Sequence, residues 1–185
     1  MSRPSGFLLW GVTVLLWCQP SLAVTVLGVP IGEKMGAQPV VCPSKKDIPK
    51  QMCWASRPSV TPAGSRLGTL RLPPSTSMPA WAANQPFTGS ISKDGAIEEL
   101  KLANVPARER AMVIRSVSKQ FGTPRAAGEQ GSTAWARWAA EGVHVGMACE
   151  GEHCLVTIRT DIAEAAARRQ AEARKTTDAG SPRAP

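Results

Sequence analysis

The stretch AWARWAAEGVHVGMACEGEHCLVTIRT, from Ala134 to Thr160, decides the fold of this chain. Turn residues divide it into three short apolar segments. In the last two segments an apolar residue recurs at every second position, at Val143, Val145, Met147 and Cys149 and then at Cys154, Val156 and Ile158. This is the period of strands that bury one face. We therefore predict an antiparallel sheet here.

Two cysteines in this stretch flank a turn. Cys149 and Cys154 stand on either side of Glu150-Gly151-Glu152-His153. In an antiparallel hairpin the two cysteines would face each other on one side of the sheet, within reach of a cross-strand disulfide.

The first 23 residues have the features of a secretory signal peptide. Arg3 precedes an apolar run from Phe7 to Trp17, and Ser21 and Ala23 have the spacing of a signal-peptidase site. The run is too short to span a bilayer, and no second apolar segment follows it. We therefore expect cleavage after Ala23, a periplasmic or secreted mature chain, and no membrane span after cleavage. The alternatives are an uncleaved anchor and a lipoprotein acylated at Cys18, but Trp17 is too bulky for a lipobox.

Cleavage would make the cysteine count even. Of the 22 Lys and Arg residues and five cysteines, the signal carries Arg3 and Cys18, which leaves 21 positive side chains against 14 Asp and Glu, a net charge of +7, and four cysteines. An even count in an exported chain favours disulfides, and locality selects Cys42 with Cys53 and Cys149 with Cys154. Zinc is the alternative, but the pairs are widely spaced and only His153 lies nearby.

The other segments predict an α+β fold. A hairpin is expected over Phe87 to Leu102, turning at Asp94-Gly95, followed by an amphipathic helix from Pro106 to Phe121. The apolar stripe of this helix is Ala107, Ala111, Ile114, Val117 and Phe121. One short strand, Leu67 to Leu72, is expected in the proline-rich connection before the hairpin.

We therefore predict one domain over residues 24–160, a small antiparallel sheet packed by one amphipathic helix and linked by disulfides. Residues 24–86 form its loop-rich half and residues 87–160 its hairpin, helix and meander. A helix of alanine and charged residues over 161–175 should project from the body, and residues 176–185 should form a disordered tail.

The chain has one dense basic cluster. Lys45, Lys46 and Lys50 lie between Cys42 and Cys53. They could contact an anionic partner such as phospholipid, lipopolysaccharide or an acidic protein face. The alternative is a solvated loop that keeps the protein soluble, and we favour it because Asp47 interrupts the run. No aromatic residue interleaves the lysines, so a nucleic-acid partner is not expected.

Three tryptophans are candidate partner-binding residues. Trp81 in its proline-rich loop is either a lid over the core or a binding anchor. Trp135 and Trp138 cannot share one face of a strand, because their separation is odd. One of the two should therefore point away from the core, unless the projecting helix covers it.

An enzyme is not expected. The chain has no tyrosine and two histidines, and it contains neither Gly-x-Ser-x-Gly, nor His-Glu-x-x-His, nor a phosphate-binding glycine loop. His153 beside Cys154 could suggest a thiol nucleophile, but a cysteine that faces Cys149 should be oxidised. We expect no catalytic residue, no metal and no cofactor.

The order of elements resembles a known group of proteins. The segment SKDGAIEELKL (Ser92 to Leu102), followed by a helix, QFGTP (Gln120 to Pro124) and a Trp-bearing strand, resembles the helix-and-meander unit of small bacterial envelope proteins, such as β-lactamase inhibitory protein and the small lipoprotein of the outer-membrane barrel assembly machine. The resemblance covers Phe87 to Thr160 and departs from the lipoprotein in lacking a lipobox. It implies a sheet face that binds another protein.

These observations favour an exported, non-enzymatic protein-binding module of the bacterial cell envelope, acting as an inhibitor, adaptor or assembly factor on an envelope or secreted protein. The alternative is a basic protein that adheres to anionic envelope polymers or lipids. Binding that salt abolishes would indicate the second function.

Overall fold

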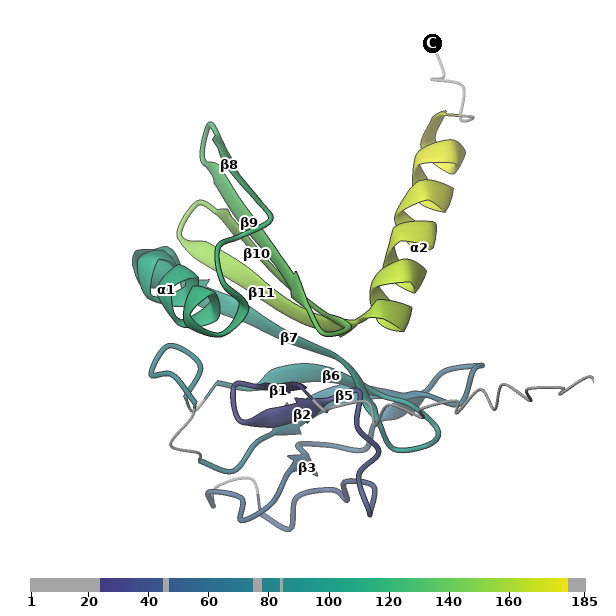
Figure 1. Ribbon diagram of the computed structural model, residues 1–185. Coiled ribbons are helices and arrows are strands. Elements are labelled where there is room, and N and C mark those ends of the chain that lie inside the picture. The colour runs from purple at the N-terminus through teal and green to yellow at the C-terminus, as the bar shows by residue number, and fades with distance from the viewer. Residues whose placement is uncertain (1–23, 45–46, 75–77, 84, 180–185) are drawn as a thin grey trace, which may run out of the picture.

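The computed structural model describes residues 24–44, 47–74, 78–83 and 85–179, so the predicted signal peptide, Lys45, Lys46 and residues 180–185 lie outside the described residues. Nine strands form one antiparallel sheet (Figure 1), in the order β3-β5-β6-β7-β11-β10-β9-β8, with β4 also paired to β5. The strands are β3 (Cys53–Trp54), β4 (Ser59–Val60), β5 (Arg66–Arg71), β6 (Phe87–Ile91), β7 (Ile97–Pro106), β8 (Ala126–Gln130), β9 (Thr133–Ala140), β10 (Val143–Glu150) and β11 (His153–Thr160). This sheet-dominated architecture with two helices agrees with the predicted α+β class, although the sheet is larger than predicted.

The predicted meander forms one end of this sheet. β10 pairs along its whole length with β9 on one side and β11 on the other, and Cys149 lies directly opposite Cys154. Glu141 and Gly142 turn the chain between β9 and β10 with φ angles of 50° and 78°, the left-handed values that a tight hairpin turn requires. The disulfide predicted between Cys149 and Cys154 is present, with Cα atoms 3.9 Å apart.

The hairpin of β6 and β7 also forms as predicted, around the Asp94-Gly95 turn. Its register shifts by one residue between Ser90 and Ile91, which marks a bulge in β7. A bulge moves the following side chains to the opposite face. Leu102 and Leu100 are buried, and uninterrupted alternation would place Glu98 next on the core face. Because of the bulge, Ile97 takes that position instead and is fully buried.

The helix predicted after this hairpin has two parts. A 3-10 turn, η1 (Ala107–Glu109), follows Pro106, and the α-helix α1 (Arg110–Phe121) continues from it. Gly122 ends α1 with a φ of 76°, a conformation that glycine adopts without a steric penalty.

The buried face of α1 differs from the predicted stripe by one residue. Val113 and Val117 are buried, and Ile114 and Phe121 pack partly against the same core. Ala111, which the stripe included, is exposed instead. Val113 precedes Val117 by four residues and so lies on the same helix face.

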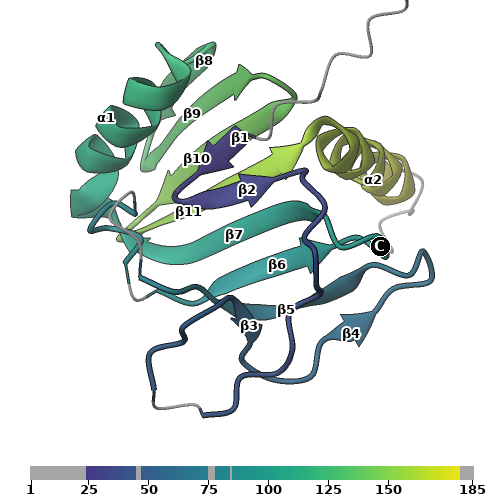
Figure 2. The same ribbon diagram turned by 60° about the horizontal axis from the view of Figure 1, so that its bottom comes forward.

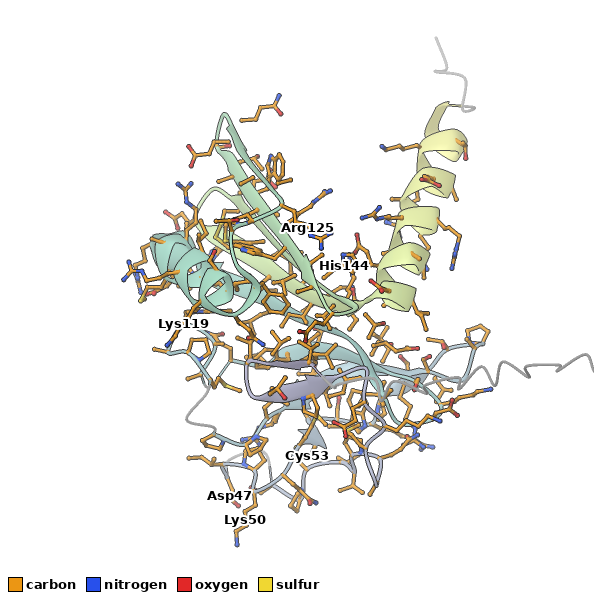
Figure 3. All side chains as sticks on the ribbon, in the orientation of Figure 1. Asp47, Lys50, Cys53, Lys119, Arg125 and His144 are labelled. Carbon is orange, nitrogen blue, oxygen red and sulfur yellow. A yellow bond between two sulfur atoms is a disulfide. The ribbon has the colours of Figure 1, made fainter. Side chains whose placement is uncertain are left out.

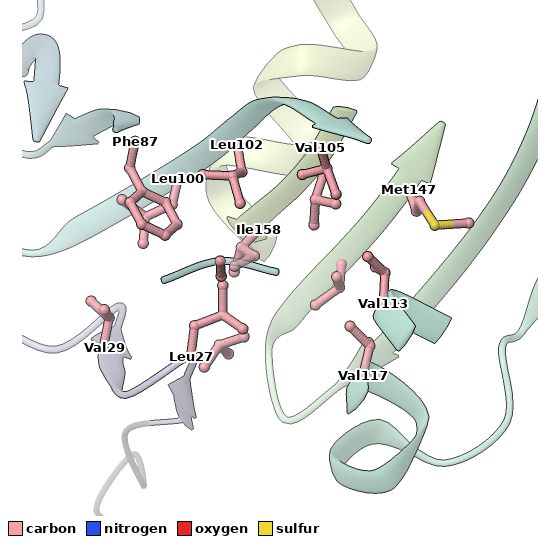
Figure 4. Packing of buried hydrophobic residues seen from close by; sticks show 14 of the residues in the cluster. Leu27, Val29, Phe87, Leu100, Leu102, Val105, Val113, Val117, Met147 and Ile158 are labelled. Atoms are coloured by element: carbon pink, nitrogen blue, oxygen red, sulfur yellow. The ribbon is translucent and has the colours of Figure 1, made fainter. Parts of the chain in front are cut away.

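A second hairpin completes the core. β1 (Val24–Val26) pairs only with β2 (Val29–Ile31) among the described strands, and this pair lies on the same face of the large sheet as α1 (Figure 2). Apolar side chains from the pair, from α1 and from the sheet form one cluster (Figure 4), which includes Leu27, Val29, Phe87, Leu100, Leu102, Val105, Val113, Val117, Met147 and Ile158. The loop-rich half and the meander half therefore share one core.

The last helix, α2 (Asp161–Ala179), leaves the end of β11 and projects from the body, as predicted. It lies on the side of β9, β10 and β11 opposite to α1 (Figure 1). It continues beyond the predicted end at Lys175 into the segment that we predicted to be disordered. No helix in the described ranges is long and apolar enough to cross a membrane.

Candidate partner-binding groove

Two of the three candidate tryptophans belong to the core. Trp81 is 5% exposed and Trp138 is 1% exposed. Their indole N–H groups donate hydrogen bonds to α1: Trp81 to the Oγ of Ser116 at 2.9 Å, and Trp138 to the Oγ of Ser118 at 3.1 Å. Trp81 therefore acts as a lid over the core, and neither residue presents an indole ring to a partner. Their assignment as partner-binding candidates is corrected accordingly.

Trp135 is the tryptophan on the outer face of the sheet, opposite to α1. It stands in a row with Ala148 and Leu155, because β9, β10 and β11 pair these three residues. Trp135 is half-buried, and Leu155 is 41% exposed. The sheet thus places two large apolar side chains on its outer face, with a small residue between them.

Small residues make this face hollow. On β10, Gly146 and Ala148 point to the outer side between the longer side chains of β9 and β11. On β8, a Cβ added to Gly128 would lie only 2.9 Å from the Cζ2 atom of Trp135, so the indole ring lies against this glycine. The result is a groove of about 500 Å³ between the outer face and the first turns of α2. We call it the outer groove.

A ladder of ion pairs attaches α2 to the sheet at the edge of the outer groove. Glu99 on β7 accepts a hydrogen bond from Arg159 on β11. The Nη1 atom of Arg159 donates to Glu164 of α2 at 3.1 Å, and the Nε atom of Arg168 donates to the same carboxylate at 3.1 Å. Lys101 adds a further contact to Glu99 at 2.9 Å. Charged groups, with little apolar packing, therefore hold α2 in place.

This ladder shifts the pKa values of Arg159 and Glu164. Partial burial opposes the charge on Arg159, but hydrogen bonds to Glu99 and Glu164 outweigh this cost and raise the pKa of the guanidinium. Burial alone would raise the pKa of Glu164, but hydrogen bonds from Arg168 and Arg159 outweigh it, so the pKa of this carboxyl group lies below its usual value. Arg159 and Glu164 therefore carry opposite charges throughout the neutral range.

A second contact holds the beginning of α2. The Nε2 atom of His144 on β10 lies 2.6 Å from the Oδ1 atom of Asp161. The backbone N–H of Ala163 donates to the hydroxyl of Thr160 at 3.3 Å, so Thr160 caps the helix. Figure 3 shows His144 and Arg125 in the space between the strands and α2.

The outer groove is positively charged. Four arginines line it against one carboxylate, Glu164. Arg137 places its guanidinium carbon 5.7 Å from the centre of the Trp135 ring, a cation–π contact. In the described part of the chain, no ion pair joins Arg125 or Arg137 to a carboxylate. Their charges are therefore available to a ligand.

Apart from Trp135 and Trp138, the residues that line the outer groove were not among the sequence candidates. Leu155 lies between Cys154 and Val156, which the alternating pattern assigns to the core. That alternation alone could have placed Leu155 on the outer face. Arg137 is two residues from Trp135 and so lies on the same face, but the pattern did not say which face that is. Arg125 and Arg168 could not be found in this way, because only the tertiary structure brings the start of β8 and the helix α2 to the same groove.

The predicted basic cluster lies far from this groove, in the loop closed by Cys42 and Cys53. The predicted disulfide is present, with Cα atoms 5.1 Å apart. Lys50 is exposed near Asp47 (Figure 3), whereas Lys45 and Lys46 lie outside the described residues. Exposed apolar side chains accompany Lys50 at Val40, Val41 and Ile48. The surface of this loop region is thus apolar as well as basic.

The cysteines offer no reactive thiol in the described residues. Cys149 and Cys154 are buried and bonded to each other, so the hypothesis of a thiol nucleophile at Cys154 is wrong for the oxidised protein. Within the same residues, no three His, Cys, Asp or Glu side chains are grouped so as to hold a metal ion.

The chain matches no family model, no curated protein and no solved structure. The geometry of the outer groove is therefore the basis for a functional assignment.

Proposed function

We propose that this chain is an exported, non-enzymatic protein-binding module that holds its partner in the outer groove. The observation that carries the proposal is the placement of two large apolar side chains, the half-buried Trp135 and the exposed Leu155, in one groove lined by arginines. Tryptophan and arginine are the residues that most often dominate the binding energy of protein interfaces. The two disulfides are compatible with a periplasmic or extracellular location.

The groove suits a protein ligand for a physical reason. An aromatic ring that is partly covered by its own sheet loses little conformational freedom when a partner covers the remainder. Arg125 and Arg137, which form no ion pair among the described residues, can donate to carboxylates or backbone carbonyls around the apolar centre. An apolar centre with a polar rim is the usual anatomy of a specific interface. The resemblance to small envelope proteins also implies a sheet face that binds another protein.

The test is capture of a partner from envelope extract by the purified, oxidised mature protein at low and high salt. A specific module should retain one partner at high salt, because apolar contacts are not screened. Trp135→Ala and Leu155→Ala should each weaken capture about tenfold or more. Trp138→Ala is not suitable for this test, because it would damage the core.

The chain offers a matched control. Met112 on α1 is 43% exposed, close to the 41% of Leu155, but it lies on the opposite side of the sheet. Met112→Ala should leave capture unchanged. If Met112→Ala reduces capture as much as Leu155→Ala does, the outer groove is not the binding site.

A second function has its own supporting observation. The exposed side chains of Val40, Val41 and Ile48 lie in the same loop region as Lys50, a combination suited to the surface of an anionic membrane. Binding to vesicles of anionic phospholipid, lost in neutral vesicles and in high salt, would support adhesion to envelope lipids. Ile48→Asp should then abolish the binding, whereas Trp135→Ala should not affect it.

A further inference from the structure

The strand β8 is a free edge of the sheet beside the outer groove. It is the last strand in the sheet order and pairs only with β9 among the described strands. Four of its five residues are exposed, and Gly128 is half-buried beside Trp135. A free edge presents unpaired backbone groups to which another chain can add as a strand.

The register shows which backbone groups are free. Gly131 and Ser132 form the turn between the paired residues Gln130 and Thr133. In a two-residue hairpin, the residues that flank the turn exchange backbone hydrogen bonds, and alternate residues face the other way. Ala127 and Glu129 therefore direct their N–H and C=O groups away from β9, toward solvent.

This edge has only one of the features that normally prevent strand addition, an inward charge that is already paired. Proteins usually protect an edge with lysine, proline or an inward charge. β8 has the sequence AAGEQ, and its single charge, Glu129, pairs with Arg110 of α1 at 2.5 Å. The edge is therefore open along most of its length.

The charges beside the edge define the chemistry of the ligand. Arg125 immediately precedes β8, and Arg137 lies opposite Ala126 in the register. A strand added along β8 would place every second side chain on the groove face, near these two cations. Glutamate or aspartate at those positions would supply the missing counter-charges.

We propose that the outer groove recognises an extended, acidic segment of its partner, which adds to β8 as an edge strand and directs carboxylates toward Arg125 and Arg137. This inference rests on the proposed function and specifies the kind of partner. Backbone hydrogen bonds along β8 supply affinity without regard to sequence, and the two arginines select for acidic side chains.

The experiment uses a short synthetic peptide of alternating glutamate and valine with blocked ends, labelled for fluorescence anisotropy. The oxidised mature protein should bind it, and should bind the corresponding lysine–valine peptide at least about tenfold more weakly. Amide hydrogen exchange at Ala127 and Glu129 should slow when the acidic peptide binds, because their N–H groups become paired.

Two variants separate the parts of the proposal. Ala127→Pro removes a solvent-facing N–H at a position where an edge strand tolerates proline, and it should abolish peptide binding without unfolding the sheet. Arg137→Glu should weaken binding at least about tenfold. Arg115→Glu reverses an exposed charge on α1 and serves as the control.

Each outcome decides a separate claim. If Ala127→Pro, confirmed as folded by circular dichroism, still binds the peptide, strand addition at β8 is wrong. If neither peptide binds while capture of the envelope partner still depends on Trp135, the inference fails and the proposed function stands. If the peptide binds but capture does not depend on Trp135, the proposed function fails instead. A wild-type dimer that Ala127→Pro dissociates would show that a second copy occupies the edge, and would overturn the proposal.

Discussion

At the scale of single residues, Trp135 and Trp138 occupy opposite faces of one strand. We therefore expect Trp138 to contribute to stability and Trp135 to contribute to binding. Trp138 is 1% exposed and its indole donates to Ser118. Replacing a buried tryptophan with alanine costs about 3 to 5 kcal/mol, because a large cavity remains. We expect Trp138→Ala to lower the free energy of unfolding by about this amount, measured by urea denaturation of the oxidised protein.

The paired control is Trp135→Ala. Because Trp135 is half-buried on the outer face, its loss should cost about 1 kcal/mol or less. Ser118→Ala should cost about 1 to 2 kcal/mol, because it leaves the buried indole N–H of Trp138 unpaired. Equal losses of stability for the two tryptophan variants would contradict the assignment of faces.

At the scale of elements, the ladder from Glu99 to Arg168 makes the attachment of α2 dependent on pH. The pKa of Glu164 is lower in the folded protein than in the unfolded chain. Its contribution to stability is therefore complete above the ordinary carboxyl pKa of about 4.3 and is lost as the pH falls through the lower folded value. We expect the helical circular dichroism signal and the amide protection of α2 to decrease over that acidic range.

Glu164→Gln should reproduce this loosening at neutral pH, because the neutral amide cannot pair with Arg159 and Arg168 as a carboxylate does. Glu172→Gln changes an exposed carboxylate farther along the same helix and should have little effect. Unchanged protection of α2 in the Glu164→Gln variant would show that contacts other than the ladder hold the helix.

Elements marked by residues close together in the sequence could be predicted. Elements that form only because another strand pairs with them could not. The Asp94-Gly95 turn, the helix ending at Gly122 and the Cys149–Cys154 hairpin follow from residues close together in the sequence. β8 was missed because its sequence, AAGEQ, has no alternation of apolar and polar residues. It is a strand only because β9 supplies its hydrogen bonds. The bulge in β7 also could not be predicted from the sequence, because it depends on the register with β6.

At the scale of the whole molecule, the outer groove is a product of topology. β7 pairs with β11, although the helix α1 and three strands separate them in the sequence. This pairing brings Glu99 beside Arg159 and so anchors α2 over the sheet. Trp135 could be proposed from the sequence, but its arginine surroundings could not, because they combine the start of β8, two central strands and a helix.

The two disulfides should contribute unequally to the stability of this assembly. Cys42 and Cys53 are 11 residues apart and close an irregular loop, whereas Cys149 and Cys154 are five residues apart in a hairpin that the sheet already holds together. A cross-link stabilises mainly by restricting the unfolded chain, and more so for longer loops. On that basis the first bridge contributes about 3 kcal/mol and the second about 2 kcal/mol.

We therefore expect the double variant Cys42→Ser/Cys53→Ser to lose more stability than Cys149→Ser/Cys154→Ser in urea denaturation. The loop variant should still bind through the outer groove, because Arg71 ties the loop to β5 by donating to the backbone carbonyls of Ser44 and Asp47 at 2.9 and 2.6 Å. The serine variants carry a separate cost, because Cys149 and Cys154 are both in the core, as Cys53 is, and serine hydroxyls there would lack partners. Replacing the same pair with alanine removes that penalty. If the alanine variants also show the hairpin bridge to be the stronger one, loop-closure entropy does not control the stability of this fold.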